Sequence, residues 1–186
     1  QLGLNQTGAA SYRSSPTQVP GTTWSNIATG NKSTMVTKTD GTLWMMGDNE
    51  YGALGQNDTV KRSSPTQIPG TNWHLSEFRG IGGEASLAMK QDGTFWTWGT
   101  FSSGRRGLNS QVKYSSPVQI PGTTWSKIAS SGTGLAAIKT DGTMWSWGQN
   151  NHGQVGNNTQ SPGYSSPVQI PGTTWVDVST AHYAYL

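Results

Sequence analysis

The chain has 186 residues, a net charge of +3 and no cysteine, and only 11% of its residues are charged. These values exclude a disulfide scaffold and a cysteine-ligated zinc site, and no apolar run approaches the roughly 18 residues of a membrane helix. Disorder is excluded as well, because 10% of the residues are aromatic and can bury much surface. Thr, Trp and Gly are abundant while Glu, Lys and Leu are scarce, so the composition favours an all-β fold.

The first sequence unit contains the signals for four short strands. Extended segments around residues 17–19 and 24–28 flank Pro20-Gly21, a pair typical of a type II turn, in which Gly accepts a positive φ. Residues 35–39 and 42–46 flank Asp40-Gly41, which predicts a tight hairpin with a two-residue loop.

The same unit then recurs along the chain with a period of about 50 residues. A Trp follows each Pro-Gly pair, at Trp24, Trp73, Trp125 and Trp175, with spacings of 49, 52 and 50 residues. The Asp-Gly pair recurs at residues 92–93 and 141–142. A period near 50 with strand and turn residues is typical of propeller blades rather than of a helical solenoid.

Residues 139–156, with the sequence KTDGTMWSWGQNNHGQVG, carry a family resemblance. The segment resembles the blade motif of the regulator of chromosome condensation repeat, in a variant similar to bacterial and viral members. The resemblance implies a β-propeller with four-stranded antiparallel blades. At this period the chain holds about 3.7 blades of a partial ring, with approximate repeats at 1–52, 53–104, 105–153 and 154–186, the last of them incomplete.

The first and last residues match the interior of a repeat. Residues 1–5 align with residues 53–57, just after a hairpin, and Leu186 occupies the position of Met35, just before one. Because a repeat buries its faces against neighbours, we expect further blades, from the same longer chain or from other copies. The first arrangement is favoured, since end-to-end joining of two copies lacks a hairpin at each junction.

Tryptophan and glycine residues dominate the repeated positions. Tryptophans can stack on sugars, but their recurrence at identical positions favours packing between blades. The glycines are explained by turns and by close backbone approach. The structural repeat positions are Trp24, Trp44, Trp73, Trp96, Trp125, Trp145, Trp175, Gly41, Gly93 and Gly142.

One blade departs from the repeat at an adjacent pair of arginines. Arg106 stands where the other units have Leu2, Leu54 and Val155, and Arg105 precedes it. Arginine is costly in an apolar position unless it is exposed or paired. The pair therefore indicates either a rearranged, solvated loop or an anchor for an acidic partner.

The loop before each Ser-Ser-Pro segment carries tyrosines and cations at recurring positions. Equivalent positions lie at equivalent places around a propeller, and the upstream residues are rich in Asn, Thr and Gln. Such a surface either is a set of solvated loops or binds a protein or a glycan, with Tyr as a stacking element. The candidate binding residues in these loops are Lys61, Arg62, Tyr12, Tyr114 and Tyr164.

No catalytic or metal-binding pattern is visible in the sequence. His74, His152 and His182 occupy different repeat positions, and the Asp residues of the turns are single carboxylates in separate blades. General acid–base chemistry needs groups that converge in one cleft. We therefore expect no metal, no cofactor and no enzymatic activity.

The function expected from these patterns is a non-enzymatic binding or structural module that presents propeller loops to a protein or glycan partner. Low charge and abundant Asn, Thr and Ser suit a fibre-like or adhesin-like bacterial or viral surface protein, outside the cell or on a virion. A surplus of three charges does not favour nucleic acid. The alternative, implied by the resemblance, is a guanine-nucleotide exchange factor for a small GTPase or a chromatin-binding protein.

Overall fold

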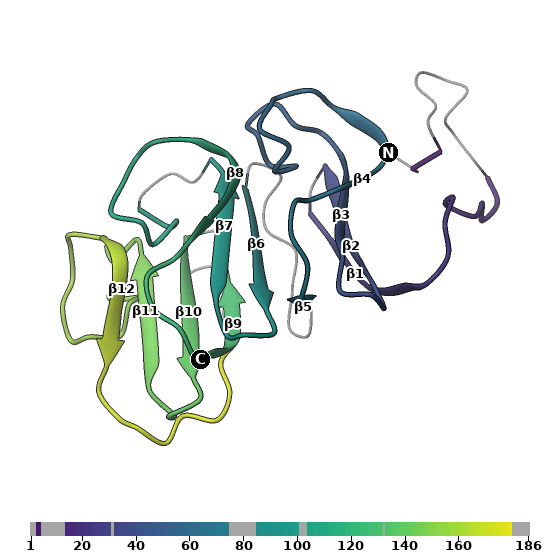
Figure 1. The fold of residues 1–186 in the computed structure, drawn as a ribbon. Coiled ribbons are helices and arrows are strands. Elements are labelled where there is room, and N and C mark those ends of the chain that lie inside the picture. Colours follow the sequence, from purple (N-terminus) through teal and green to yellow (C-terminus); the bar gives the residue numbers. More distant parts are fainter. Residues whose placement is uncertain are drawn as a thin grey trace.

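The computed structural model describes residues 3–4, 14–30, 32–74, 85–100, 104–131 and 133–179. In these segments twelve strands form three antiparallel sheets of four strands each. The described residues include no helix, and hence none long and apolar enough to cross a membrane. Figure 1 shows the three sheets side by side in chain order, as blades of an incomplete ring. The prediction of a β-propeller is confirmed.

Each blade begins at a repeated Trp and ends in the following Ser-Ser-Pro segment. Blade 1 contains β1 (Trp24–Thr29), β2 (Ser33–Lys38), β3 (Leu43–Gly47) and β4 (Arg62–Gln67). Blade 2 contains β5 (Trp73–His74), β6 (Ala85–Lys90), β7 (Phe95–Gly99) and β8 (Tyr114–Gln119). Blade 3 contains β9 (Trp125–Ser130), β10 (Gly134–Lys139), β11 (Met144–Gly148) and β12 (Tyr164–Ile170).

The Ser-Ser-Pro segments therefore form the last strand of a blade. Each pairs with the third strand, and the pairing is irregular beside the proline, as between Met45 and Gly47 opposite β4. Proline has no N–H to give to a ladder, so it suits the outer strand of the sheet. The segment expected around residues 17–19 is described but has no strand partner among the described residues.

The Asp-Gly hairpins have three-residue loops, not the two-residue loops expected from the sequence. In blade 1 the Gly41 N–H donates to the Lys38 carbonyl, and the Lys38 N–H donates to the Thr42 carbonyl, both at 3.0 Å. Gly41 has a φ of +75°, whereas Asp40 is not among the residues with positive φ. The Asp40 carboxylate instead accepts a 2.9 Å bond from the Thr42 N–H, which favours this turn over the tighter one.

The apolar core lies between the blades. One cluster joins blades 1 and 2 and includes Leu54, Ile68 and Trp98, and a second joins blades 2 and 3 and includes Ile120 and Trp147. All five side chains are at most 1% exposed. Each blade is thus stabilised mainly by its neighbours, as in other repeat folds.

Candidate binding surface

The antiparallel blades have two chemically different ends. The turn end carries the Asp-Gly and Pro-Gly turns. The long-loop end carries the connections between third and fourth strands, residues 48–61, 100–113 and 149–163, together with those between first and second strands. Antiparallel order puts all of these connections at the same end of their sheets, as can be followed in Figure 1.

At the turn end the repeated tryptophans are used in packing. In blade 2 the Lys90 ammonium lies 4.8 Å from the Trp73 ring centroid and 4.6 Å from that of Trp96. The two rings meet edge to face. Blades 1 and 3 repeat the arrangement around Lys38 and Lys139. Cation–π contacts of this kind stabilise the ends of the strands, in accord with the packing role that the sequence favoured for the Trp set.

The long-loop end receives the predicted binding residues of all three blades. Lys61 and Arg62 come from blade 1, Arg105, Arg106 and Tyr114 from blade 2, and Tyr164 from blade 3. Tyr12 lies outside the described residues, as do residues 75–84, where the repeat carries a three-residue insertion.

The long loops of blades 1 and 2 pack onto the following blade. Asn49 is fully buried and organises the loop of blade 1, because its Oδ1 accepts from the Leu54 N–H and its Nδ2 donates to the Val60 carbonyl. Trp98 of blade 2 then donates a 2.8 Å bond from Nε1 to the Ala53 carbonyl. Asn150 has the same role in blade 3. The equivalent residue in blade 2 is Phe101, which lies outside the described residues.

Arg106 departs from its expected exposure. Its side chain is only 2% exposed, in the position where Leu54 packs in the preceding junction. The guanidinium lies 5.4 Å from the Tyr114 ring centroid, while Nε and Nη1 have no hydrogen-bond partner among the described residues. Burial lowers the pKa of Arg106, although an Arg stays charged at neutral pH. A solvated position is therefore wrong for Arg106, and its side chain is not available for direct contact in this structure.

Two cations of blade 1, the exposed Lys61 and the half-buried Arg62, are paired with carboxylates. Lys61 lies 3.3 Å from the Asp48 carboxylate, and Arg62 lies 2.6 Å from that of Asp58. Burial by itself would raise the pKa of Asp48, but hydrogen bonds from Lys61 and from the Glu50 N–H outweigh it and hold the pKa below its ordinary value. Hydrogen bonds from the Val60 N–H and from Arg62 likewise lower the pKa of Asp58.

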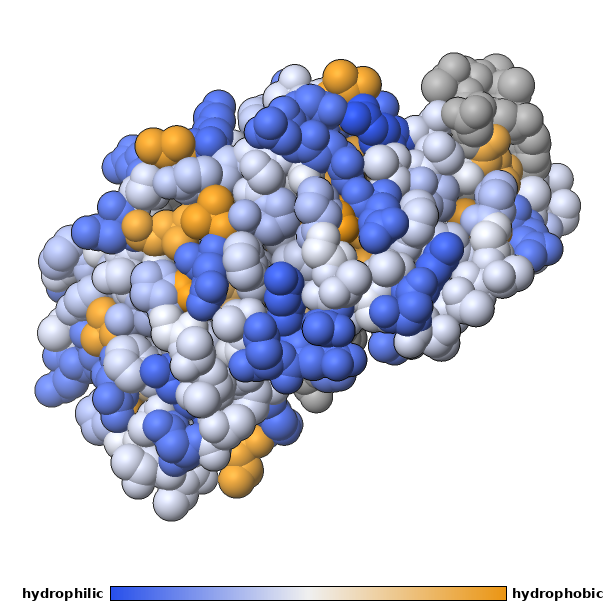
Figure 2. Space-filling model, viewed as in Figure 1, coloured by the Kyte–Doolittle hydropathy of each residue, from blue (hydrophilic) through white to orange (hydrophobic). Residues whose placement is uncertain are grey.

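Two exposed valines mark the same end and were not identified from the sequence. Val60 is 60% exposed and Val112 is 59% exposed, each directly before a lysine. Figure 2 shows several separate apolar patches among polar residues on the face that it presents. The recurrence of a Val-Lys pair in two neighbouring loops was the available signal.

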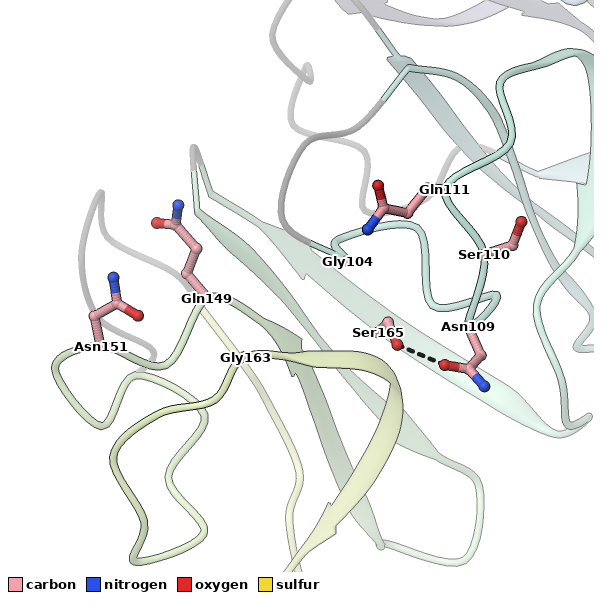
Figure 3. Close-up of a pocket in the computed structure, with 8 residues that line it drawn as sticks. All are labelled: Gly104, Asn109, Ser110, Gln111, Gln149, Asn151, Gly163 and Ser165. Carbon is pink, nitrogen blue, oxygen red and sulfur yellow. Dashed lines mark hydrogen bonds between the residues drawn. The ribbon is translucent and has the colours of Figure 1, made fainter.

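A pocket of about 450 Å³ opens between the long loops of blades 2 and 3. Figure 3 shows Gln111 on the side of the β7–β8 loop and Gln149 and Asn151 on the side of the β11–β12 loop. Below them the Ser165 hydroxyl donates a 2.7 Å bond to Oδ1 of Asn109. The described side chains that line the pocket are Asn109, Ser110, Gln111, Gln149, Asn151 and Ser165, all uncharged and hydrophilic.

Tyr164 lies next to this pocket without lining it. Its hydroxyl is 3.2 Å from that of Thr159, and this bond, followed by one with Asn157, lowers the pKa of Tyr164. Among the described residues no group of three or more His, Cys, Asp or Glu side chains could hold a metal.

The comparisons with known proteins agree with this architecture. Two family models, both described as the regulator of chromosome condensation (RCC1) repeat, match residues 40–78 and 141–184 and residues 125–154. The human X-linked retinitis pigmentosa GTPase regulator is 30% identical over 124 residues, which cover 64% of this chain and 12% of that protein.

Solved structures show the same fold at low sequence identity. Prp20p from Saccharomyces cerevisiae, in a structure reported with its binding to Gsp1p and histones, is similar with a TM-score of 0.75 and 18% identity, covering 93% of this chain and 44% of that one. Human WBSCR16 has a TM-score of 0.64 and 23% identity, covering 80% and 38%. Yeast RCC1 (Prp20) bound to Kap60 has a TM-score of 0.73 and 18% identity, covering 87% and 41%. This chain therefore spans less than half of each of these relatives. With the repeat models matching more than half of its residues, the chain belongs to the regulator of chromosome condensation (RCC1) repeat family.

Proposed function

We propose that the chain is a non-catalytic binding module whose long-loop end contacts a protein partner. The observation that carries the proposal is the pair of exposed valines, Val60 and Val112, each followed by a lysine. The two valines offer apolar surface at the same end of neighbouring blades, and the lysine beside each can steer an oppositely charged partner toward it.

The charge of this end indicates what the partner carries. The described long loops and their neighbouring connections hold Lys32, Lys61, Arg62, Arg105 and Lys113 as accessible cations, against Asp48, Glu50 and Asp58. An acidic, partly apolar partner surface fits this balance, because opposite potentials steer association and fix register. Arg105 carries the anchoring role of the arginine pair in this proposal, while the side chain of Arg106 is buried at the blade junction.

We also propose that the module works as part of a larger surface protein, outside a cell or on a virion. The low content of charged residues and the Asn, Thr and Ser in the loops support this setting. Fractionation of the source organism or particle with an antibody against the chain tests it, and recovery of the protein in the cytosol alone would overturn it.

Photo-crosslinking tests the contact surface directly. A photoreactive residue at Val112 is expected to capture the partner, whereas one at Asp141, at the turn end, is not. The double variant Lys61→Glu, Lys113→Glu should lower the yield from position 112 by about tenfold, since it reverses the charge at both valines. Capture that is equal from both ends, or unchanged by the charge reversal, contradicts the proposal.

A second candidate function is nucleotide exchange on a small GTPase. It is favoured by the human GTPase regulator, which is 30% identical over the matched region. A nucleotide-release assay with a fluorescent GDP analogue separates the two functions. Accelerated release that is lost in the charge-reversed variant would make exchange the function of the same surface.

A further inference from the structure

The pocket between blades 2 and 3 lies at a junction whose sequence lacks a pair of side chains that the preceding junction has. At the junction of blades 1 and 2 the Lys113 ammonium lies 5.6 Å from the Tyr51 ring centroid, so that the loop of blade 1 contacts the next blade through these two side chains. The positions equivalent to Tyr51 and Lys113 at the next junction are Ser103 and Gly163 in the sequence. At that junction the described residues border a hollow of about 450 Å³.

The backbone around Gly163 holds the hollow open. A Cβ atom on Gly163 would lie 2.6 Å from the Gly148 carbonyl oxygen, so no side chain fits without a shift of the main chain. On the opposite side the Asn109 N–H donates a 2.7 Å bond to the Ser165 carbonyl, and Asn109 adopts a φ of +48°, which Asn tolerates. Both walls are thus fixed by backbone geometry, which favours a preformed site.

Three amide side chains in the pocket have free hydrogen-bonding capacity. Gln111 and Asn151 have no side-chain partner among the described residues, and Asn109 uses only its Oδ1. Each amide offers an acceptor and two donors in a fixed plane. Water occupies such groups when no ligand is bound, and a ligand gains affinity only if it reproduces the bonds of the displaced water.

The lining selects among classes of ligand. Among the described residues, the lining contains no charged side chain, which disfavours phosphates and carboxylates, and no aromatic ring, which disfavours a stacked nucleobase. The described part of the lining also forms no apolar groove and no arginine cluster, the features by which extended peptides are usually bound. A compact, neutral ligand with many hydroxyl groups matches the amides and serines, and the volume is that of small-molecule sites.

We infer that this pocket, formed by Asn109, Gln111, Gln149 and Asn151, is a binding site for a neutral saccharide. The inference rests on the proposal that the long-loop end is the binding end, and it assigns a ligand class to one position on it. The protein contact at Val60 and Val112 and the saccharide site are separate parts of the same end.

The test is a titration of the whole chain, labelled with ¹⁵N, with glucose, galactose, N-acetylglucosamine and their neutral disaccharides. One or more should bind with a dissociation constant in about the millimolar range or tighter, as expected for a small polar ligand. The shifted resonances should be those of residues 104–111 and 149–165, including the side-chain amides of Gln111 and Asn151. Glucuronic acid serves as the charged comparison and should bind more weakly.

A bulky substitution in the pocket, and the same substitution at the equivalent position of another blade, provide a matched pair of variants. Gln111→Trp is at an exposed position and should weaken binding by at least about tenfold. Its equivalent in blade 1 is Thr59→Trp, at the junction where Lys113 contacts Tyr51, which should leave the affinity unchanged. Equal loss in both variants, or shifts that map elsewhere, would overturn the inference.

The remaining outcomes are distinguishable from failure of the proposed function. If no neutral saccharide shifts the pocket resonances, or if uncharged peptides on an array bind there and saccharides do not, the saccharide site is wrong. Cross-linking from Val112 that still depends on Lys61 and Lys113 would then leave the protein contact standing. The converse result, a saccharide bound without any charge-dependent partner, would remove the protein contact alone.

Discussion

Trp147 donates a 3.0 Å hydrogen bond from its indole N–H to the carbonyl oxygen of Arg105, across the junction between blades 2 and 3. Trp98 makes the equivalent bond to Ala53 across the preceding junction. The loop with two arginines is therefore tied to its neighbour by the same bond as a loop that follows the repeat. What differs is the next side chain, which is Leu54 in one loop and Arg106 in the other.

Arg106→Leu should stabilise the protein. The substitution removes a buried guanidinium whose Nε and Nη1 have no partner among the described residues, and it restores the side chain found at Leu54. Buried unsatisfied donors cost about 1–3 kcal/mol, so the free energy of unfolding in urea should rise by about that amount.

The reciprocal variant is the control for Arg106. Leu54→Arg places a guanidinium in the fully buried position of the preceding junction, where Asn49 organises the loop, and it should destabilise. A loss of stability in Arg106→Leu would show that the contact with Tyr114 outweighs the cost of burial.

The lysines above the tryptophan pairs should contribute more to stability than an exposed ion pair. Lys90→Met keeps the length of the side chain but removes the charge, and we expect a cost of about 0.5–2 kcal/mol from the two lost cation–π contacts. Lys127→Met, which removes a surface pair with Asp177, should cost about 0–1 kcal/mol. An equal decrease in the free energy of unfolding for both variants, measured in urea, would mean that the cation–π contacts of Lys90 stabilise no more than a surface ion pair.

The sequence was sufficient for the fold class because the Pro-Gly and Asp-Gly turns recur with the tryptophans at a fixed spacing. It did not reveal which strand closes a blade. The segment at residues 62–67 follows a long loop and pairs with β3. This pairing is non-local, so the spacing of the repeated residues does not predict it. The Asp-Gly loop is one residue longer than expected, because the bond from the Thr42 N–H to Asp40 favours the wider turn.

The candidate surface could be predicted only in part. Recurrence in the loops before Ser-Ser-Pro correctly placed Lys61, Tyr114 and Tyr164 at one end of the propeller. Whether a junction contains a pocket depends on contacts between a loop and the next blade, such as that of Lys113 with Tyr51 at the preceding junction. Such contacts cannot be predicted from the spacing of the repeat. The burial of Arg106 has the same cause, because the loop carries it into the junction.

Stability should fall as the pH drops below about 4, through the Asp-Gly turns. The side-chain hydroxyl of Thr42, and then its N–H, hold the pKa of Asp40 below its ordinary value, and Asp92 and Asp141 have the same shift from Thr94 and Thr143. A lowered folded-state pKa gives stability that is present above the unfolded pKa and is lost as pH falls through the folded pKa. The triple variant Asp40→Asn, Asp92→Asn, Asp141→Asn should show a flatter dependence of Tm on pH between about 2 and 5. An unchanged slope would assign the acid sensitivity to other carboxylates, such as Asp48 and Asp58.

Gly104→Ala should be more destabilising than Gly153→Ala, although both glycines occupy the same repeat position. Their φ angles are +74° and +76°, so the cost of placing an L side chain in the left-handed region, about 1–2 kcal/mol, is shared. A Cβ atom on Gly104 would lie 2.9 Å from the Ser165 Cα of the next blade, whereas the nearest atoms to one on Gly153 are 3.8 Å away. The difference between the two variants therefore reports the close approach of the loop to blade 3. It should amount to about 1–3 kcal/mol in the free energy of unfolding, the usual cost of an extra methyl group in a packed site. Equal values would mean that the loop relaxes away from Ser165 without loss, and that the 2.7 Å bond from the Asn109 N–H to Ser165 is not what positions it.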